Sequence, residues 1–165
     1  MNVASAQVDH YKLEVGLYLQ EVQEVGNILL YVYDLRMVKP NECNIDGYDG
    51  MRPSVVHSIE HLLAWNLRKV AVDVGKSASD IISVYPYGCT TGMGCISLLS
   101  KEEFAPILKK AIEVSLDATE VPFADPKLCG NYHYQDLRGA KHELERYYDD
   151  LEDVSWSVWV SPRIE

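Results

Sequence analysis

Residues 27–36 read NILLYVYDLR, a stretch rich in β-branched and aromatic side chains. It contains five consecutive apolar residues, Ile28 to Val32. Such a run is typical of a strand that is central in its sheet or buried on both faces. Partial alternation predicts an earlier strand within residues 8–19, and strand-like segments recur at residues 80–87 (DIISVYPY) and 154–160 (VSWSVWV). The sequence therefore predicts several strands.

Segments of helical character alternate with these strands. In VVHSIEHLLAWNLRKVAV (residues 55–72) the apolar residues at 55, 56, 59, 62, 63 and 67 follow helical spacing. Ser100 and Glu103 form a capping box that predicts a helix running to about Ala118, and the charged residues 135–150 predict another. Glycines 88, 92 and 94 predict a flexible stretch around Cys89. Because the connections are short, we expect an α+β fold in which an antiparallel β-sheet has helices packed on one face.

The composition is that of a globular protein and argues against several kinds of partner. A chain of 165 residues with 47% hydrophobic and 24% charged residues suits a single domain, residues 1–165. The formal net charge of −10 repels phosphate backbones, so nucleic acid is not an expected partner. No apolar run approaches the roughly 18 residues of a membrane span, and residues 1–20 lack the pattern of a signal peptide. We therefore expect a cytoplasmic protein that does not bind membranes.

The sharpest local motif is HSIEH, residues 57–61. Because His57 and His61 are four residues apart, a helix projects both imidazoles from the same side, where they can bind one divalent metal ion. Glu60 lies close to that position without having to be a ligand, as a general base does. Two histidines and a glutamate also occur on solvated helix faces, but the apolar residues around the motif predict a largely buried helix and favour a metal site.

Two histidines do not complete a metal site, and the spacing leaves the third ligand open. The candidates are His133, His142, the acidic residues and the cysteines. Cysteines occur at positions 43, 89, 95 and 129, and without a signal peptide free thiols or metal ligands are favoured over disulfides. Cys129 lies in the loop sequence CGNY, where a thiolate can reach a metal, but spacing alone does not favour it over His133.

Cys89 follows a strand-like segment on a turn flanked by Gly88 and Gly92. Such a turn can expose a sulfur and direct backbone N–H groups at it, which lowers the pKa of the thiol. A packed core thiol is the ordinary interpretation of a lone cysteine. His10 and Arg36 stand at the ends of strand-like segments, and their ordinary interpretation is a surface salt bridge.

Several short blocks, taken together, resemble the S-ribosylhomocysteine lyase (LuxS) family. They are VDH at residues 8–10 with Ser5 before it, DLR at 34–36 followed by PN at 40–41, HSIEHLLA at 57–64, PYGCTTG at 86–92, and CGNY at 129–132. Any one block could arise by chance, but all five occur in the family's order with fitting spacing. They extend over residues 5–132.

The resemblance implies both chemistry and residue roles. Its implied metal ligands are His57, His61 and Cys129, holding one divalent metal ion per subunit, with Fe²⁺ as the usual ion and Zn²⁺ or Co²⁺ as substitutes. The implied acid/base pair is Glu60 and Cys89, and the implied substrate-pocket residues are Ser5, His10 and Arg36. The family cleaves S-ribosylhomocysteine to homocysteine and 4,5-dihydroxy-2,3-pentanedione, the precursor of the quorum-sensing signal autoinducer-2.

The resemblance also implies a LuxS/MPP-like metallohydrolase-type fold and a homodimer with the pocket at the subunit boundary. The chain departs from the family pattern at Trp65, Ser83, Tyr87 and Thr90, and the tail, residues 149–165, is not matched. These departures affect the shape of the pocket and leave the metal and acid/base residues in place. Two other functions remain in competition: a metallopeptidase of the inverted H-x-x-E-H type, and a metal-binding domain without catalysis.

Overall fold

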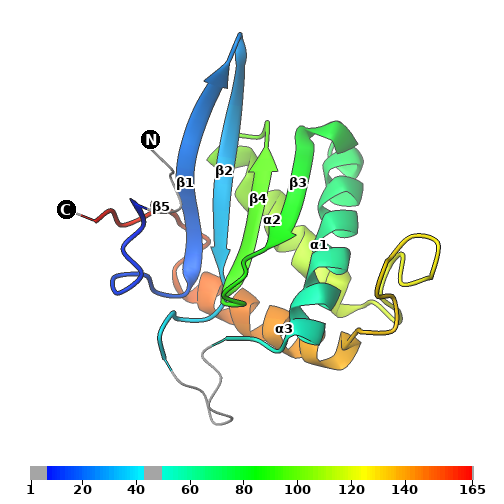
Figure 1. Cartoon of the computed structure of the whole chain (residues 1–165). Helices are drawn as coiled ribbons and strands as arrows, with labels where there is room; N and C mark the ends of the chain where they lie inside the picture. Colours follow the sequence, from blue (N-terminus) through cyan, green and yellow to red (C-terminus); the bar gives the residue numbers. More distant parts are fainter. Residues whose placement is uncertain (1–6, 43–49, 165) are drawn as a thin grey trace.

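The computed structural model describes residues 7–42 and 50–164. Within these residues, five strands form one sheet in the order β3-β4-β2-β1-β5 (Figure 1). The strands are β1 (Gly16–Val25), β2 (Ile28–Arg36), β3 (Ile81–Pro86), β4 (Gly92–Ser97) and β5 (Val158–Val160). Neighbouring strands pair antiparallel, except that β5 runs parallel to β1. The strand predicted from NILLYVYDLR is thus β2, and it is central in the sheet.

The prediction of burial along β2 is correct only for its second half. Residues 32–36 are buried, whereas Ile28 and Leu29 are 52% and 46% exposed. The reason is the pairing: β4 reaches only as far as Tyr31, so the start of β2 projects beyond the sheet with β1 as its single partner. Figure 1 shows this hairpin extending past the other strands. The earlier strand, expected within residues 8–19, begins only at Gly16.

In the described part of the chain, three α-helices pack against one face of the sheet: α1 (Pro53–Asp73), α2 (Lys101–Leu116) and α3 (Leu137–Asp153) (Figure 1). Alternate strand residues, including Leu17, Tyr33 and Leu35, turn toward them and are fully buried. The capping box predicted at Ser100 and Glu103 is present at the start of α2. A short 3₁₀-helix, η2 (Ala78–Asp80), precedes β3. The α+β class is confirmed. None of the helices in the described ranges is both long enough and apolar enough to cross a membrane.

The prediction of a flexible stretch around glycines 88, 92 and 94 is wrong for its second half, because Gly92 begins β4. A Cβ atom at Gly92 would lie 2.4 Å from the carbonyl oxygen of Leu35, and one at Gly94 would lie 2.2 Å from the ring of Tyr85. These glycines therefore permit close packing against neighbouring strands. A sequence pattern cannot distinguish that use of glycine from a loop.

Replacing Gly92 with alanine should destabilise the fold. The added methyl group meets backbone of β2, which cannot move aside as a flexible side chain could. We expect the free energy of unfolding to fall by about 1–3 kcal/mol, the usual cost of overpacking. Urea denaturation of the variant measures it. Gly130→Ala is the matched control, since a Cβ there meets no atom within 4 Å, and an equal loss in that variant would contradict the packing argument.

Candidate active site

Helix α1 brings the two histidines of the HSIEH motif together. Pro53 occupies its first turn, where a proline suits a helix, and His57 and His61 then project from the same side. Their ring centroids are 4.8 Å apart with the planes at 79°. The Nδ1 atom of His57 lies 2.9 Å from the carbonyl oxygen of Tyr134, and that of His61 lies 2.6 Å from the carbonyl oxygen of Pro122.

These two contacts determine which ring nitrogens remain available. A carbonyl oxygen only accepts, so each Nδ1 must carry the proton and donate it. The Nε2 atoms of His57 and His61 are then left with lone pairs, as metal-binding histidines require. Both carbonyls belong to residues 117–136, the α2–α3 loop, which connects those two helices. That loop therefore orients the imidazoles of α1.

Cys129, in the same loop, completes a group of three metal-binding side chains. Its sulfur lies 3.3 Å from the Nε2 atom of His57, and the ligand atoms of His57, His61 and Cys129 all lie within 4.8 Å of one another. With bonds of about 2.3 Å to sulfur and about 2.05 Å to nitrogen, tetrahedral ligands stand about 3.5 Å apart. The donor set and its spacing thus fit a divalent metal ion with three protein ligands and one open position.

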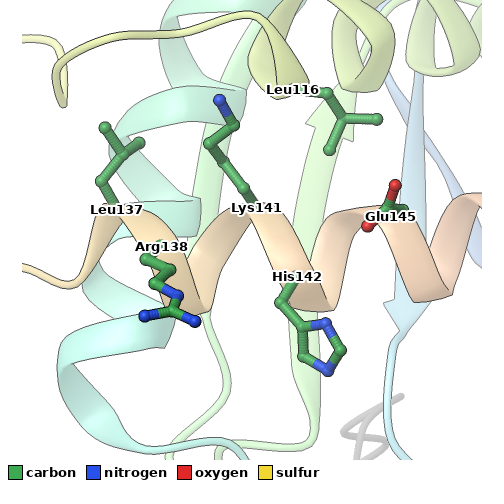
Figure 2. A pocket seen from close by; sticks show the side chains of 6 residues that line it. All are labelled: Leu116, Leu137, Arg138, Lys141, His142 and Glu145. Carbon is green, nitrogen blue, oxygen red and sulfur yellow. The ribbon is translucent and has the colours of Figure 1, made fainter.

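The other histidine candidates lie elsewhere. His133 is exposed, with its ring against that of Tyr132 at 4.2 Å between centroids. His142 lies on α3 and lines a separate cavity of about 550 Å³ between that helix and Leu116 at the end of α2 (Figure 2). Leu137, Arg138, Lys141 and Glu145 complete that lining. This cavity is larger than the one beside the metal-binding group, described next, but it contains none of the three grouped ligands. Its size therefore does not mark the site of chemistry.

A smaller cavity, of about 330 Å³, lies beside the metal-binding group. Its lining includes His57 and Glu60 from α1, Asn131 and Tyr134 from the α2–α3 loop, and the segment that follows β3. Glu60 is partly buried and stands on the helix between the two histidines. It therefore faces the space that a molecule bound near the metal group would occupy.

Cys89 lies on the turn that connects β3 to β4, and its side chain is exposed, so the ordinary interpretation of a packed core thiol was wrong. The hydroxyl of Thr91 lies 3.1 Å from the sulfur, and the Nη1 atom of Arg36 lies 3.9 Å from it. Partial burial would raise the pKa of the Cys89 thiol, but the hydrogen bonds from Thr91 and the positive charge of Arg36 outweigh burial and lower it. The geometry thus favours a reactive thiolate. Sequence analysis missed Thr91, although it stands in the PYGCTTG block.

Arg36 and Asp34 do not form the surface salt bridge that their residue types suggested. Their exposures are 3% and 0%, and the Nη2 atom of Arg36 donates to Asp34 Oδ2 at 2.8 Å. The interpretation of Arg36 as part of a surface salt bridge was wrong, because the burial of Arg36 arises from the pairing of β2 with its neighbouring strands, which the sequence does not reveal. The pair lies on the sheet face away from the core that packs against the helices.

A third cavity, of about 200 Å³, is lined by Cys89 and Arg36 together with His10 and Gln20. Tyr87 and Gly88 line this cavity and also the one beside Glu60. The turn that carries Cys89 therefore borders two cavities, the one beside the metal-binding group and the one that contains Cys89 and Arg36. Ser5, the remaining predicted pocket residue, lies outside the described residues.

The turn that carries Cys89 is also anchored to the start of α1. Thr90 adopts a left-handed conformation with φ of 59°, which is uncommon for a β-branched residue. Its carbonyl oxygen accepts a hydrogen bond of 2.9 Å from the amide of Met51. A Cβ at Gly50 would lie 2.9 Å from the carbonyl oxygens of both Cys89 and Thr90, so only glycine permits this approach.

Comparison with known proteins agrees with this geometry. The family described as S-Ribosylhomocysteinase (LuxS) matches residues 3–157, which include all of α3 and extend beyond the five sequence blocks. An S-ribosylhomocysteine lyase of Exiguobacterium sibiricum is 32% identical over 88% of this chain and 88% of its own, and one of Finegoldia magna is 31% identical over 97% of each. A third, of Phocaeicola vulgatus, is 32% identical over 90% of this chain and 89% of its own. The chain belongs to the S-ribosylhomocysteinase (LuxS) family.

Proposed function

We propose that this protein is an S-ribosylhomocysteine lyase, a carbon–sulfur lyase that cleaves the thioether of its substrate. The products are homocysteine and 4,5-dihydroxy-2,3-pentanedione, the precursor of autoinducer-2, a quorum-sensing signal. Family membership and three relatives bearing that name support the proposal. The observation that carries it is the placement of the Cys89 turn. Its residues Tyr87, Gly88 and Thr90 line the cavity that contains His57 and Glu60, and its Cys89 thiol, whose pKa is lowered, lines the adjoining cavity.

His57, His61 and Cys129 would hold one metal ion per chain, a stoichiometry that the family and the three-ligand group both support. Ferrous iron is the proposed ion, with Zn²⁺ or Co²⁺ as functional substitutes. Such an ion supplies Lewis-acid polarisation of the sugar carbonyl when bound. The inverted metallopeptidase is disfavoured, because the group found in the described part of the chain takes a thiol as third ligand where that enzyme needs a carboxylate.

The reaction requires protons to move between neighbouring carbons, because a C–S bond breaks readily only when it is β to a carbonyl. Cys89, as thiolate, removes a proton from one carbon and returns it to the next, which moves the carbonyl along the sugar. Glu60 transfers the hydroxyl protons during these steps. Glu60 then removes the final C–H proton, and the electron pair expels homocysteine as its thiolate.

Other residues and the assembly complete the proposal. Ser5, His10 and Arg36 contact the substrate, and the protein is a homodimer with its pocket at the subunit boundary. Residues 1–165 act as one catalytic domain of the LuxS/MPP-like metallohydrolase type. We place the protein in the cytoplasm, where reducing conditions suit the free thiols of Cys89, Cys95 and Cys129.

The deciding experiment is incubation of protein purified without oxygen with S-ribosylhomocysteine, followed by an assay for free thiol. A lyase releases one thiol per substrate. When the reaction is run in D₂O, a lyase also incorporates solvent deuterium into the pentanedione product. A metallopeptidase instead cleaves an unstructured peptide substrate, and a metal-binding domain does neither. Absence of thiol release from metal-loaded protein would refute the proposed function.

Replacing Glu60 with glutamine should keep the metal ion and nearly abolish thiol release. Glutamine has the size of glutamate but cannot accept a proton, and general acid–base catalysis contributes about 10²–10⁴-fold. Metal content and turnover are measured on the same preparation. Glu102→Gln, an exposed carboxylate on α2, is the matched control. Turnover within a factor of about ten of wild type would exclude Glu60 as the base.

A further inference from the structure

The guanidinium of Arg36 is held from several sides by groups of the protein itself. Its Nη2 atom donates to Asp34, its Nη1 atom donates to the hydroxyl of Thr91, and Nη1 also lies 3.9 Å from the sulfur of Cys89. Its centre stands 4.8 Å from the ring centroid of Tyr87. Since Arg36 is 3% exposed, these groups rather than solvent determine where its charge lies.

Asp34 sets the direction of the guanidinium. It lies two residues before Arg36 on β2, so both side chains leave the same face of the sheet. The carboxylate is fully buried, and Arg36 is its ion-pair partner. Burial raises the pKa of the Asp34 carboxyl, while the guanidinium favours its ionised form. A buried charge that loses its partner is strongly destabilised, so each member of this pair constrains the other.

Tyr87 supports the guanidinium from another side. The ring provides a flat face for the cation, a contact that is strongest where water is excluded. Its hydroxyl is buried and faces Asp34 but makes no hydrogen bond of ordinary geometry within the described residues, so the contact of this side chain with the guanidinium comes from the ring. Tyr87 also precedes Cys89 by two residues on the same turn, which links the position of the ring to that of the sulfur.

We propose that Asp34 and Tyr87 are positioning residues that hold the guanidinium of Arg36 against the sulfur of Cys89. Asp34 acts through the ion pair and Tyr87 through the face of its ring. Arg36 in turn contacts the sulfur and the hydroxyl of Thr91. The proposal rests on the proposed role of Cys89 as a proton-transferring thiolate.

The pH dependence of Cys89 alkylation tests the Tyr87 part directly. Metal-loaded protein is treated with iodoacetamide from about pH 5 to about pH 9, and modification of the Cys89 peptide is followed by mass spectrometry. Tyr87→Leu removes the ring and should raise the alkylation midpoint by about 0.5 to 1 pH unit. Tyr87→Phe removes only the hydroxyl, keeps the ring over the guanidinium and should keep the wild-type midpoint. An unchanged midpoint in Tyr87→Leu, or an equal rise in Tyr87→Phe, would overturn the role of the ring.

The sign of the shift in Asp34→Asn distinguishes two roles. If Asp34 were only a negative charge near the thiol, its removal would lower the alkylation midpoint. If it positions Arg36, its removal lets the guanidinium move away and raises the midpoint by about 1 pH unit. We expect the rise, together with a lower kcat at neutral pH. A fall or no shift would exclude the positioning role, and circular dichroism establishes that the variant is folded. Should it fail to fold, the Tyr87 pair still tests whether Arg36 is positioned.

Other titratable side chains face Asp34 from neighbouring parts of the structure. The phenols of Tyr18, Tyr85 and Tyr147 face Asp34, and burial raises the pKa of each, so they stay neutral over the range tested. His10 also faces Asp34, so the titration is repeated in His10→Asn. Alkylation does not require turnover. A wild-type protein that released no thiol from S-ribosylhomocysteine would refute the lyase and leave this measurement interpretable.

Discussion

Replacing Cys89 with alanine is expected to reduce the release of homocysteine from S-ribosylhomocysteine by about 10³-fold or more while the metal ion stays bound. The methyl group cannot take a proton from one sugar carbon and return it to the next. Because Cys89 is exposed on a turn and is not part of the metal-binding group, neither the fold nor the metal depends on its sulfur. Turnover and metal content on one preparation provide the measurement.

The pH profile of the wild-type enzyme should agree with this role. Burial opposes ionisation of Cys89, but Thr91 and Arg36 lower the pKa of its thiol below the ordinary value. The thiolate therefore persists to lower pH than that of an ordinary cysteine and is lost as the pH falls through the lowered pKa. The kcat of the wild-type enzyme should fall in parallel on the acid side, and Cys89→Ser should be inactive across the range. Wild-type turnover in Cys89→Ala would contradict the proton-transfer role.

Cys95 offers a matched control on the next strand. It is fully buried in β4, and burial raises the pKa of its thiol to about 12, so it is uncharged and unreactive at neutral pH. We expect Cys95→Ala to retain turnover. Loss of activity in both variants would point to a general effect of cysteine removal.

Cys129→Ala should lose the metal ion rather than the chemistry alone. The remaining imidazoles of His57 and His61 leave two protein ligands where a stable site of this kind uses at least three. We expect the metal content of the purified protein to fall from about one per chain to below about 0.1, with turnover lost in parallel. Elemental analysis after dialysis against a weak chelator measures it.

His133→Ala is the control, since His133 lies in the same loop yet outside the three-ligand group. It should keep a full complement of metal. The reverse result, with metal retained in Cys129→Ala and lost in His133→Ala, would show that the loop presents a different ligand.

The parts of the site that could be predicted from the sequence are those whose geometry is local. Helical spacing alone places His57 and His61 on one side of α1, and the turn of Cys89 follows from its flanking glycines. The third ligand could not be chosen from spacing, because the position of Cys129 depends on how the α2–α3 loop folds back over α1. The family resemblance named Cys129, and the structure groups it with the two histidines.

Long-range pairing explains the remaining differences. The apolar run at residues 28–32 predicted a central strand, but it did not reveal that Arg36 at the end of that strand would be buried, because a charged residue at a strand end is ordinarily exposed. The same run made the start of β2 look buried, whereas Ile28 and Leu29 extend past the end of β4. Strand β4 itself was missed because its glycines serve close packing, which can be recognised only when the neighbouring strands are known.

The order of the ligands along the chain has a consequence for biosynthesis. Two imidazoles come from a single helix, whereas the sulfur lies 72 residues after His57 and reaches it through a loop that ends against the same helix. A nascent polypeptide that has emerged from the ribosome only as far as the end of α2 therefore offers a cation two nitrogen ligands, which bind it only weakly. Capture of the ion waits until the α2–α3 loop has been translated and has closed over α1, so metal loading follows the folding of both segments.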